Sequence, residues 1–308
     1  MPITVREAYL QGREHLAASG SAEAPIEAEV LLRHVLQLDR AALYTGWDRP
    51  ISEDAWHQFQ RVLDERARGR PVPYIVGQRE FMGFTFAVDE RVMIPRPETE
   101  VLVECIVEWV GRRERGNAAA PTPASSARGG ARERDVGSRL PDPGSRLFVV
   151  DVGTGSGCIA VSLAQLLPSA IVFATDISME ALEVARANAA RHRVGNRITF
   201  LQGDLLAPLP PHLAGRVDAV AGNPPYVPVS QRAALPREIR DFEPPVAVFI
   251  DGDGIAVHRQ LIAMEVGAGQ ADDVAGAMAG DGKYARVRTL ADYSGIQRVV
   301  VGERAASP

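Results

Sequence analysis

The chain has 308 residues, of which 46% are hydrophobic and 24% are charged, and its formal net charge is -5. This length exceeds the usual size of one compact domain, so we expect two domains with ordinary soluble-protein cores. A mildly acidic total gives no reason to expect stable nucleic-acid binding through bulk charge, although a local basic face could coexist with it.

Two further features indicate a soluble, cytoplasmic protein without a metal site. The most apolar stretch, Leu147 to Leu167, is interrupted by Asp151 and several glycines, so no membrane span is expected. Cys105 and Cys158 lie far apart without metal-binding spacing, and the six histidines also lack such spacing. We therefore expect reduced thiols and no bound metal.

Residues 1–70 carry apolar side chains at helical intervals. Thr4 and Glu7 have the spacing of a capping box, Pro25 suits a first helical position, and Ser52 precedes another apolar stripe. The pattern predicts a small helical bundle, which we treat as a separate domain.

A connector and an insertion follow the bundle. Short aromatic and β-branched runs broken by glycine and proline occupy residues 71–95 and predict a hairpin-like connector. Pro97 then begins an apolar helical pattern. Residues 112–145 are rich in Gly, Pro, Ala, Ser and Arg and nearly free of large apolar groups, which predicts a disordered insertion.

Strand-like and helix-like segments alternate after the insertion and close with two strand candidates near the end of the chain. Such alternation is typical of a parallel sheet wrapped by helices, with ligands at the carboxyl ends of the strands. We predict an α/β, Rossmann-like domain over residues 96–308, preceded by the helical bundle.

The first of these strands runs into a glycine-rich loop, Asp151-Val152-Gly153-Thr154-Gly155-Ser156-Gly157. Glycines at a strand-to-helix turn allow close backbone approach to a ligand at the helix N-terminus. A nicotinamide-type fingerprint would need glycine or alanine at Cys158, so that match fails. The loop instead resembles motif I of class I S-adenosylmethionine-dependent methyltransferases.

Two further carboxylates end the next strands. Asp176 lies 23 residues beyond Gly153, where a carboxylate can accept both hydroxyl protons of a ribose. Asp204 is placed for the amino group of an adenine, with Leu205 beside the ring. Because aspartate is also a common cap of strand-to-helix turns, Asp204 fits either interpretation equally well.

The fourth strand ends in Asn223-Pro224-Pro225-Tyr226. The Asn223 side-chain oxygen and the Pro224 carbonyl can accept the two protons of a planar NH2 group and direct its lone pair toward a methyl donor. The prolines hold this turn extended, and Tyr226 offers a flat face for stacking. The alternative is a strand simply terminated by prolines.

Together these motifs resemble the HemK/PrmC family of protein-glutamine N5-methyltransferases, which modify the glutamine of the Gly-Gly-Gln motif in peptide chain release factors. The "IPRPETE" sequence at 94–100 is more specific to this family than NPPY. The resemblance extends over residues 70–104, 151–164, 174–192, 201–206, 223–228 and 235–254.

The resemblance implies S-adenosyl-L-methionine as cofactor and release factors as partners. Residues 153–157 would hold its methionine part, Asp176 its ribose, and Asp204 and Leu205 its adenine. Asn223 would contact both cofactor and substrate glutamine, with residues 224–226 completing the substrate site. The bundle would recognise the release factor, and Arg96 and Glu98 would lie near the cofactor or form a salt bridge at a helix start.

One departure from the family concerns the fifth strand. The family has a full apolar strand ending in Glu-Ile-Gly, whereas this chain passes from Leu261 to Val266 almost without a break. Either residues 255–266 rearrange to fill the gap, or the sheet is weakened there. Two alternatives stay open: a nucleic-acid amino-group methyltransferase, and a degenerate homologue that binds cofactor without turnover.

Overall fold

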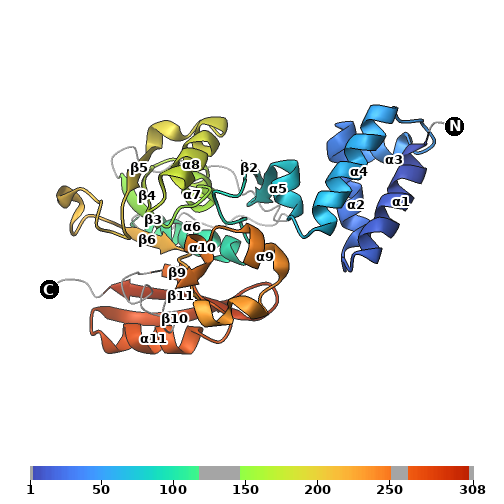
Figure 1. Ribbon diagram of the computed structural model, residues 1–308. Helices are drawn as coiled ribbons and strands as arrows, with labels where there is room; N and C mark the ends of the chain where they lie inside the picture. The colour runs from blue at the N-terminus through green and yellow to red at the C-terminus, as the bar shows by residue number, and fades with distance from the viewer. Residues whose placement is uncertain (1–2, 118–145, 251–262, 305–308) are drawn as a thin grey trace, which may run out of the picture.

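The computed structural model describes residues 3–117, 146–250 and 263–304. Its first four helices form the expected bundle, which stands beside the sheet in Figure 1. They are α1 (Val5–Ala18), α2 (Ala24–Leu36), α3 (Arg40–Thr45) and α4 (Glu53–Ala67). The capping box of Thr4 and Glu7 begins α1, while Asp39 and Ser52 accept backbone N–H groups at the starts of α3 and α4.

A short helix and a hairpin connect the bundle to the sheet. They are α5 (Val72–Val76), β1 (Gln78–Phe81) and β2 (Phe84–Ala87). The amide of Asn188 exchanges two hydrogen bonds with the backbone of Ala87, at 2.7 and 3.0 Å. Because Asn188 is fully buried, this pair fixes the hairpin to α8 (Met179–Arg191), which packs on the central sheet.

Helix α6 (Pro97–Asn117) follows the connector. It differs from the sequence prediction at its end, because residues 112–117, expected to begin the insertion, continue the helix. The remainder of the predicted insertion, residues 118–145, lies outside the described residues. The described helices include none long and apolar enough to cross a bilayer.

The centre of the molecule is a seven-stranded sheet of order β10-β11-β9-β6-β3-β4-β5. The five strands from β9 to β5 run parallel, and the β10–β11 hairpin adds an antiparallel edge. This confirms the predicted α/β class. The strands are β3 (Leu147–Val152), β4 (Ala170–Asp176), β5 (Ile198–Gln202), β6 (Ala219–Gly222), β9 (Ala263–Glu265), β10 (Tyr284–Ala291) and β11 (Gln297–Arg304).

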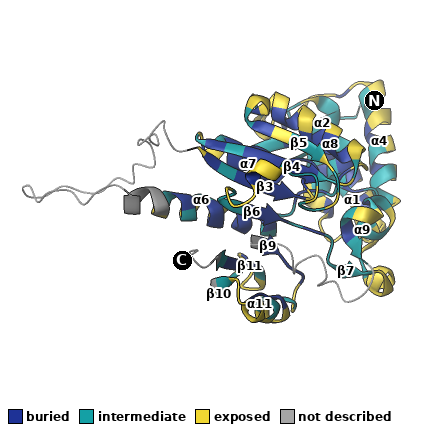
Figure 2. Cartoon of the chain, turned by 90° about the vertical axis from the view of Figure 1, so that its left-hand side faces the viewer, coloured by how far each residue is buried: buried dark blue, intermediate teal, exposed yellow. Residues whose placement is uncertain are grey.

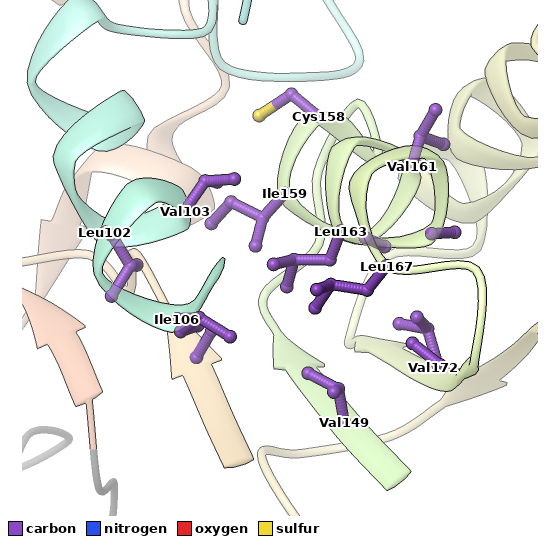
Figure 3. Packing of buried hydrophobic residues seen from close by; sticks show 14 of the residues in the cluster. Leu102, Val103, Ile106, Val149, Cys158, Ile159, Val161, Leu163, Leu167 and Val172 are labelled. Atoms are coloured by element: carbon purple, nitrogen blue, oxygen red, sulfur yellow. The ribbon is translucent and has the colours of Figure 1, made fainter. Parts of the chain in front are cut away.

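Apolar helix faces cover both sides of the sheet, and Figure 2 shows the buried strands between exposed outer helix surfaces. On one side, α6 and α7 (Cys158–Leu166) meet over β3 and β4 together with α8 (Met179–Arg191), and on the other α11 (Ala271–Gly280) packs. Each fully buried leucine contributes roughly 1.5–3 kcal/mol to stability. Figure 3 labels side chains at the α6–α7 contact: Leu102, Val103, Ile106, Ile159, Leu163 and Leu167.

The remaining shorter elements lie in the connections outside the seven-stranded sheet. The two-residue strands β7 and β8 pair in parallel, with helical turns between them. These elements are η1 (Gly195–Arg197), η2 (Pro211–Leu213), β7 (Val227–Pro228), η3 (Val229–Ala234), α9 (Arg237–Phe242), α10 (Pro245–Val248) and β8 (Phe249–Ile250).

The fifth strand position is filled, although by only three residues. Ala263 and Met264 of β9 pair with β6, and all three residues of β9 pair with β11. Met264 and Val266 are fully buried. The first of the two expected outcomes therefore holds at residues 263–265, while residues 255–262 lie outside the described part of the chain.

Because β9 is short, part of each neighbouring strand is unpaired, among the described residues, on the side that faces β9, although it pairs with β3 or β10 on its other side. Ala219 and Val220 of β6, and Gly302 and Glu303 of β11, extend beyond the register of β9. A cavity of about 900 Å³ lies beside these four residues. Toward the carboxyl end of β9, Met264 pairs with both β6 and β11 and Glu265 pairs with β11, and this is the end that faces the candidate site.

Candidate active site

A cavity of about 350 Å³ lies at the carboxyl ends of β3, β4 and β6. Ligands of parallel α/β sheets bind at this edge. The structure brings together most of the predicted site residues there, but Gly157 and Tyr226 are not among those that line the cavity. The predicted residues that line it are Gly153, Thr154, Gly155, Ser156, Asp176, Asp204, Leu205, Asn223, Pro224 and Pro225.

The glycine-rich loop after β3 turns through left-handed backbone conformations. Gly153 and Gly155 have φ angles of 68° and 53°. An L-residue would lose roughly 1–2 kcal/mol at each position. A Cβ added to Gly153 would meet no atom within 4 Å, so the space next to this residue is open. Gly157 instead caps α7 and packs against Ala185 of α8.

Asp151 anchors this loop from below. Its Oδ2 accepts hydrogen bonds from the Thr154 hydroxyl at 2.6 Å and from the Ala160 N–H at 3.1 Å. Because the side chain is completely buried, desolvation raises the pKa of Asp151 to about 7. The carboxyl group therefore holds the loop and the start of α7 in one arrangement.

Asp176 ends β4 and faces the same loop. Its Oδ2 accepts the Gly155 N–H and its Oδ1 accepts the Ser178 N–H, each at 2.9 Å. Burial raises the pKa of Asp176 despite these hydrogen bonds. The two hydrogen bonds thus hold the carboxylate in a fixed orientation at the cavity wall.

Asp204 and Leu205 form the wall on the β5 side. The turn is closed by the backbone hydrogen bond from Ala207 N to the Asp204 carbonyl at 3.0 Å. Leu205 adopts a φ of 47°, which is uncommon for a side chain of this size. Such backbone strain is concentrated at ligand sites, and here it turns Leu205 to line the cavity.

Asn223 follows β6 directly, and the nitrogen and oxygen of its side-chain amide have different surroundings. Its Nδ2 donates to the Thr99 hydroxyl at 3.1 Å. Its Oδ1 is buried and has no hydrogen-bond partner among the described residues. A buried acceptor without a donor costs about 1–3 kcal/mol, and Oδ1 is thus left as an acceptor that a further N–H group could satisfy.

Thr99 in turn contacts a buried carboxylate. The Thr99 hydroxyl and Glu265 Oε2 are hydrogen-bonded, and both side chains are almost fully buried. Glu265 is the last residue of β9, and Thr99 lies in the first turn of α6. Desolvation raises the pKa of Glu265 to about 7. Two successive hydrogen bonds therefore link Asn223 to the first turn of α6 and, through it, to the end of β9.

Two family models match the chain: the PrmC N-terminal domain over residues 7–77 and a methyltransferase domain over residues 149–242. The release factor glutamine methyltransferase of Moorella thermoacetica is 35% identical over 98% of this chain and 99% of its own length. That of Koribacter versatilis is 33% identical over 99% of this chain and 100% of its own length. This chain belongs to the release factor glutamine methyltransferase family. It is an S-adenosylmethionine-dependent methyltransferase.

Among solved structures, the N-terminal domain of human METTL16 in complex with SAH resembles the chain weakly. It is 14% identical, has a TM-score of 0.46, and the match covers 94% of each chain. A likeness this weak carries no functional argument. The family assignment rests on the sequence relatives.

Arg96 and Glu98 do not line the cavity. Arg96 forms an ion pair with Glu243, whose side chain is only 1% exposed. The interaction joins the start of α6 to the segment between α9 and α10. Of the two roles that the sequence left open for Arg96, the structure supports the ion pair, although its partner lies far along the chain.

Tyr226 lies behind the cavity wall. Its backbone carbonyl accepts from Gln270 Nε2 at 3.2 Å, and its ring approaches Gly267. Burial raises the pKa of the Tyr226 hydroxyl to about 12. The flat face predicted for substrate stacking is thus not part of the 350 Å³ cavity itself.

Sequence reasoning missed Thr99 and Glu265. Thr99 is part of the "IPRPETE" segment, in which only Arg96 and Glu98 were predicted to have a role. Glu265 ends the shortened strand, at the position where the family has the glutamate of Glu-Ile-Gly. That match was a signal for a retained role, even though most of the strand is absent.

Proposed function

We propose that this chain transfers a methyl group from S-adenosyl-L-methionine to the side-chain amide nitrogen of the glutamine in the Gly-Gly-Gln motif of peptide chain release factors. The names of its relatives support this choice of substrate. The observation that carries the chemistry is the buried, unpaired Oδ1 of Asn223 at the cavity. This oxygen can accept a hydrogen bond from the N–H group of a primary amide.

The residues around the cavity fit the parts of the cofactor. Backbone groups of residues 153–157 would hold the methionine part in the open space next to Gly153. Asp176 would accept the ribose hydroxyl protons, and Asp204 with Leu205 would flank the adenine. When bound, the cofactor supplies an electrophilic methyl group on a sulfonium.

The NPPY residues would orient the substrate amide. Asn223 Oδ1 and the Pro224 carbonyl accept its two N–H protons, while Pro225 and Tyr226 shape the substrate site behind them. An amide nitrogen is a poor nucleophile because its lone pair is delocalised, so fixing both protons directs the remaining electron density toward the methyl group. With the methyl group supplied by the cofactor in exchange for its S–C bond, the amide nitrogen would gain an N–C bond and lose its surplus proton to solvent.

The helical bundle of residues 1–70 would recognise the release factor. Support for this comes from its fixed position beside the catalytic half. Arg66 of α4 bridges Glu27 of α2, at 2.9 Å, and Glu238 of α9, and its side chain is only 10% exposed. A substrate held by the bundle would therefore meet the cavity at a defined distance. The reaction would take place in the cytoplasm, because its protein substrates act in translation termination.

Mass spectrometry tests this proposal. Purified unmodified release factor is incubated with the chain and S-adenosylmethionine, and the Gly-Gly-Gln peptide is then analysed. One added methyl group on the glutamine is the expected result. Cofactor binding without any added methyl group would favour a degenerate homologue, and methylation of nucleic acid instead would favour the other alternative.

A further inference from the structure

Asn223 is useful to the proposed reaction in only one of its two amide orientations. With Oδ1 toward the substrate it offers an acceptor to an NH2 group. With the amide turned by 180° it would offer a second NH2 group, which cannot accept a proton from the substrate. Something in the site must therefore choose between two orientations of nearly identical shape.

The choice is made by a chain of two hydrogen bonds. An ionised carboxylate can only accept, so the Thr99 hydroxyl must donate its single proton to Glu265. The Thr99 oxygen is then left as an acceptor, and only Nδ2 of Asn223 can satisfy it, at 3.1 Å. Oδ1 is consequently turned away from Thr99, as observed for this unpaired atom.

We propose that Glu265 is a positioning residue, which acts through Thr99 to fix the Asn223 amide with Oδ1 toward the methyl-accepting nitrogen. This inference rests on the proposed function, because it assigns the oriented atom to the substrate amide. Glu265 itself does not line the 350 Å³ cavity.

A second contact from the same segment supports the assignment. Gln270 Oε1 accepts the Gly267 N–H at 2.9 Å, which leaves Gln270 Nε2 to donate to the Tyr226 carbonyl. The end of β9 and the residues after it thus hold both ends of the NPPY turn, Asn223 through Glu265 and Thr99, and Tyr226 through Gln270. The carboxyl end of the fifth strand is the part needed for this purpose, and it is the part that the chain retains.

The surroundings of Glu265 make the arrangement sensitive to pH. Burial raises the pKa of Glu265 to about 7, well above its ordinary value of 4.5. A protonated Glu265 can donate to Thr99, which can then donate to Asn223 Oδ1 and release the amide orientation. Several charged or titratable groups interact electrostatically with Glu265. They lie in α6 and directly before it, in α7, in β11 and in the NPPY turn: Arg96, Glu98, Cys158, Arg298 and Tyr226.

The test compares Glu265→Gln and Thr99→Val with the wild type on a release factor substrate. The glutamine at 265 can donate a hydrogen bond as well as accept one, and the valine at 99 can do neither. Each variant therefore removes the constraint on the Asn223 amide orientation while nearly keeping the side-chain volume. We expect kcat to fall by about 10- to 100-fold, as for loss of a preorganised acceptor. The Kd for S-adenosylhomocysteine should stay within about twofold, and Thr99→Ser should retain most of the activity.

Two further readouts separate positioning from mere stability. Wild-type kcat should rise through about pH 7, because the ionised carboxylate is the orienting form, and Glu265→Gln should lose this inflection. The double variant should lose no more than either single variant, because both act through one chain of contacts. Glu104→Gln, an exposed carboxylate on the same helix as Thr99, is the matched control and should leave kcat unchanged.

Nuclear magnetic resonance of the Asn223 side-chain amide keeps this inference separate from the substrate assignment. Its NH2 signal, assigned by its absence in Asn223→Asp, should exchange with solvent more slowly in the wild type than in Thr99→Val. Slow exchange without methyl transfer would overturn the proposed substrate and leave the orientation standing. Wild-type kcat in both variants, or rapid exchange in the wild type, would overturn the role of Glu265.

Discussion

The Gly155 N–H donates to the Asp176 carboxylate at 2.9 Å, which joins the loop after β3 to the end of β4. Twenty-one residues separate the two in sequence. Because β3 and β4 are neighbours in parallel register, their carboxyl ends lie side by side and this contact follows from the sheet. A change at Asp176 should therefore disturb the loop and the cofactor together.

Asp176→Asn should weaken cofactor binding. An asparagine presents an NH2 group to either the Gly155 or the Ser178 N–H, so one backbone donor loses its acceptor. We expect the Kd for S-adenosylhomocysteine to rise by about tenfold or more, measured by calorimetry. Asp273→Asn, an exposed change in α11, is the control and should bind normally. Equal affinity of the two variants would contradict the role of Asp176.

Asn223→Ala should abolish turnover without unfolding the protein. The substitution removes Oδ1, which has no hydrogen-bond partner among the described residues, together with Nδ2, which donates to Thr99, so one unpaired acceptor is exchanged for another. We expect a loss of about 100- to 1,000-fold in kcat, comparable to removal of one preorganised transition-state contact. Thermal melting should change little, and the exposed Asn196→Ala variant should behave as the wild type in both assays. Near-normal methylation by Asn223→Ala would refute the mechanism.

Arg66→Ala should loosen the bundle from the catalytic half. It leaves Glu27 and Glu238 without their shared cation. We expect KM for the full release factor to rise by about three- to tenfold, which corresponds to roughly 1 kcal/mol. With a short Gly-Gly-Gln peptide, kcat should not change. The exposed Arg61→Ala on the same helix is the control, and a parallel rise there would show a general charge effect instead.

Asp151 should make stability depend on pH. Its folded pKa is raised to about 7 from 3.8, so the fold favours the neutral carboxyl group. The free energy of unfolding therefore decreases as pH rises from about 4 to about 7, and this contribution is constant above that range. The slope from one group is at most about 1.4 kcal/mol per pH unit. Chemical denaturation of wild type and Asp151→Asn should differ by this slope; parallel pH profiles would contradict it.

Replacement of residues 118–145 by a short Gly-Ser linker should leave methylation within about twofold of the wild type. The replaced segment has few large apolar residues, and added loop length carries only a small entropic cost. Helix α6 is kept to Asn117 in this variant, because its residues 112–117 are helical. A large rise in KM for release factor would show that the segment takes part in substrate binding.

Local patterns in the sequence determined the helix caps, the glycine-rich loop and the NPPY turn. Thr4, Ser52 and the loop glycines each act on backbone groups within a few residues, so their neighbours in sequence are enough to interpret them. The regular alternation of strands and helices also placed Asp176 at the correct edge of the sheet, where it lines the cavity.

Only the tertiary structure decided which side chains stand behind Asn223. Thr99 precedes it by 124 residues, and Glu265 follows Thr99 by 166 residues. The order of strands in the sheet sets these contacts, because β9 lies beside β6 and α6 packs against β9. A hydrogen bond between distant segments leaves no periodic pattern in either one. The sequence therefore determined the reacting turn, and the fold decided how that turn is oriented.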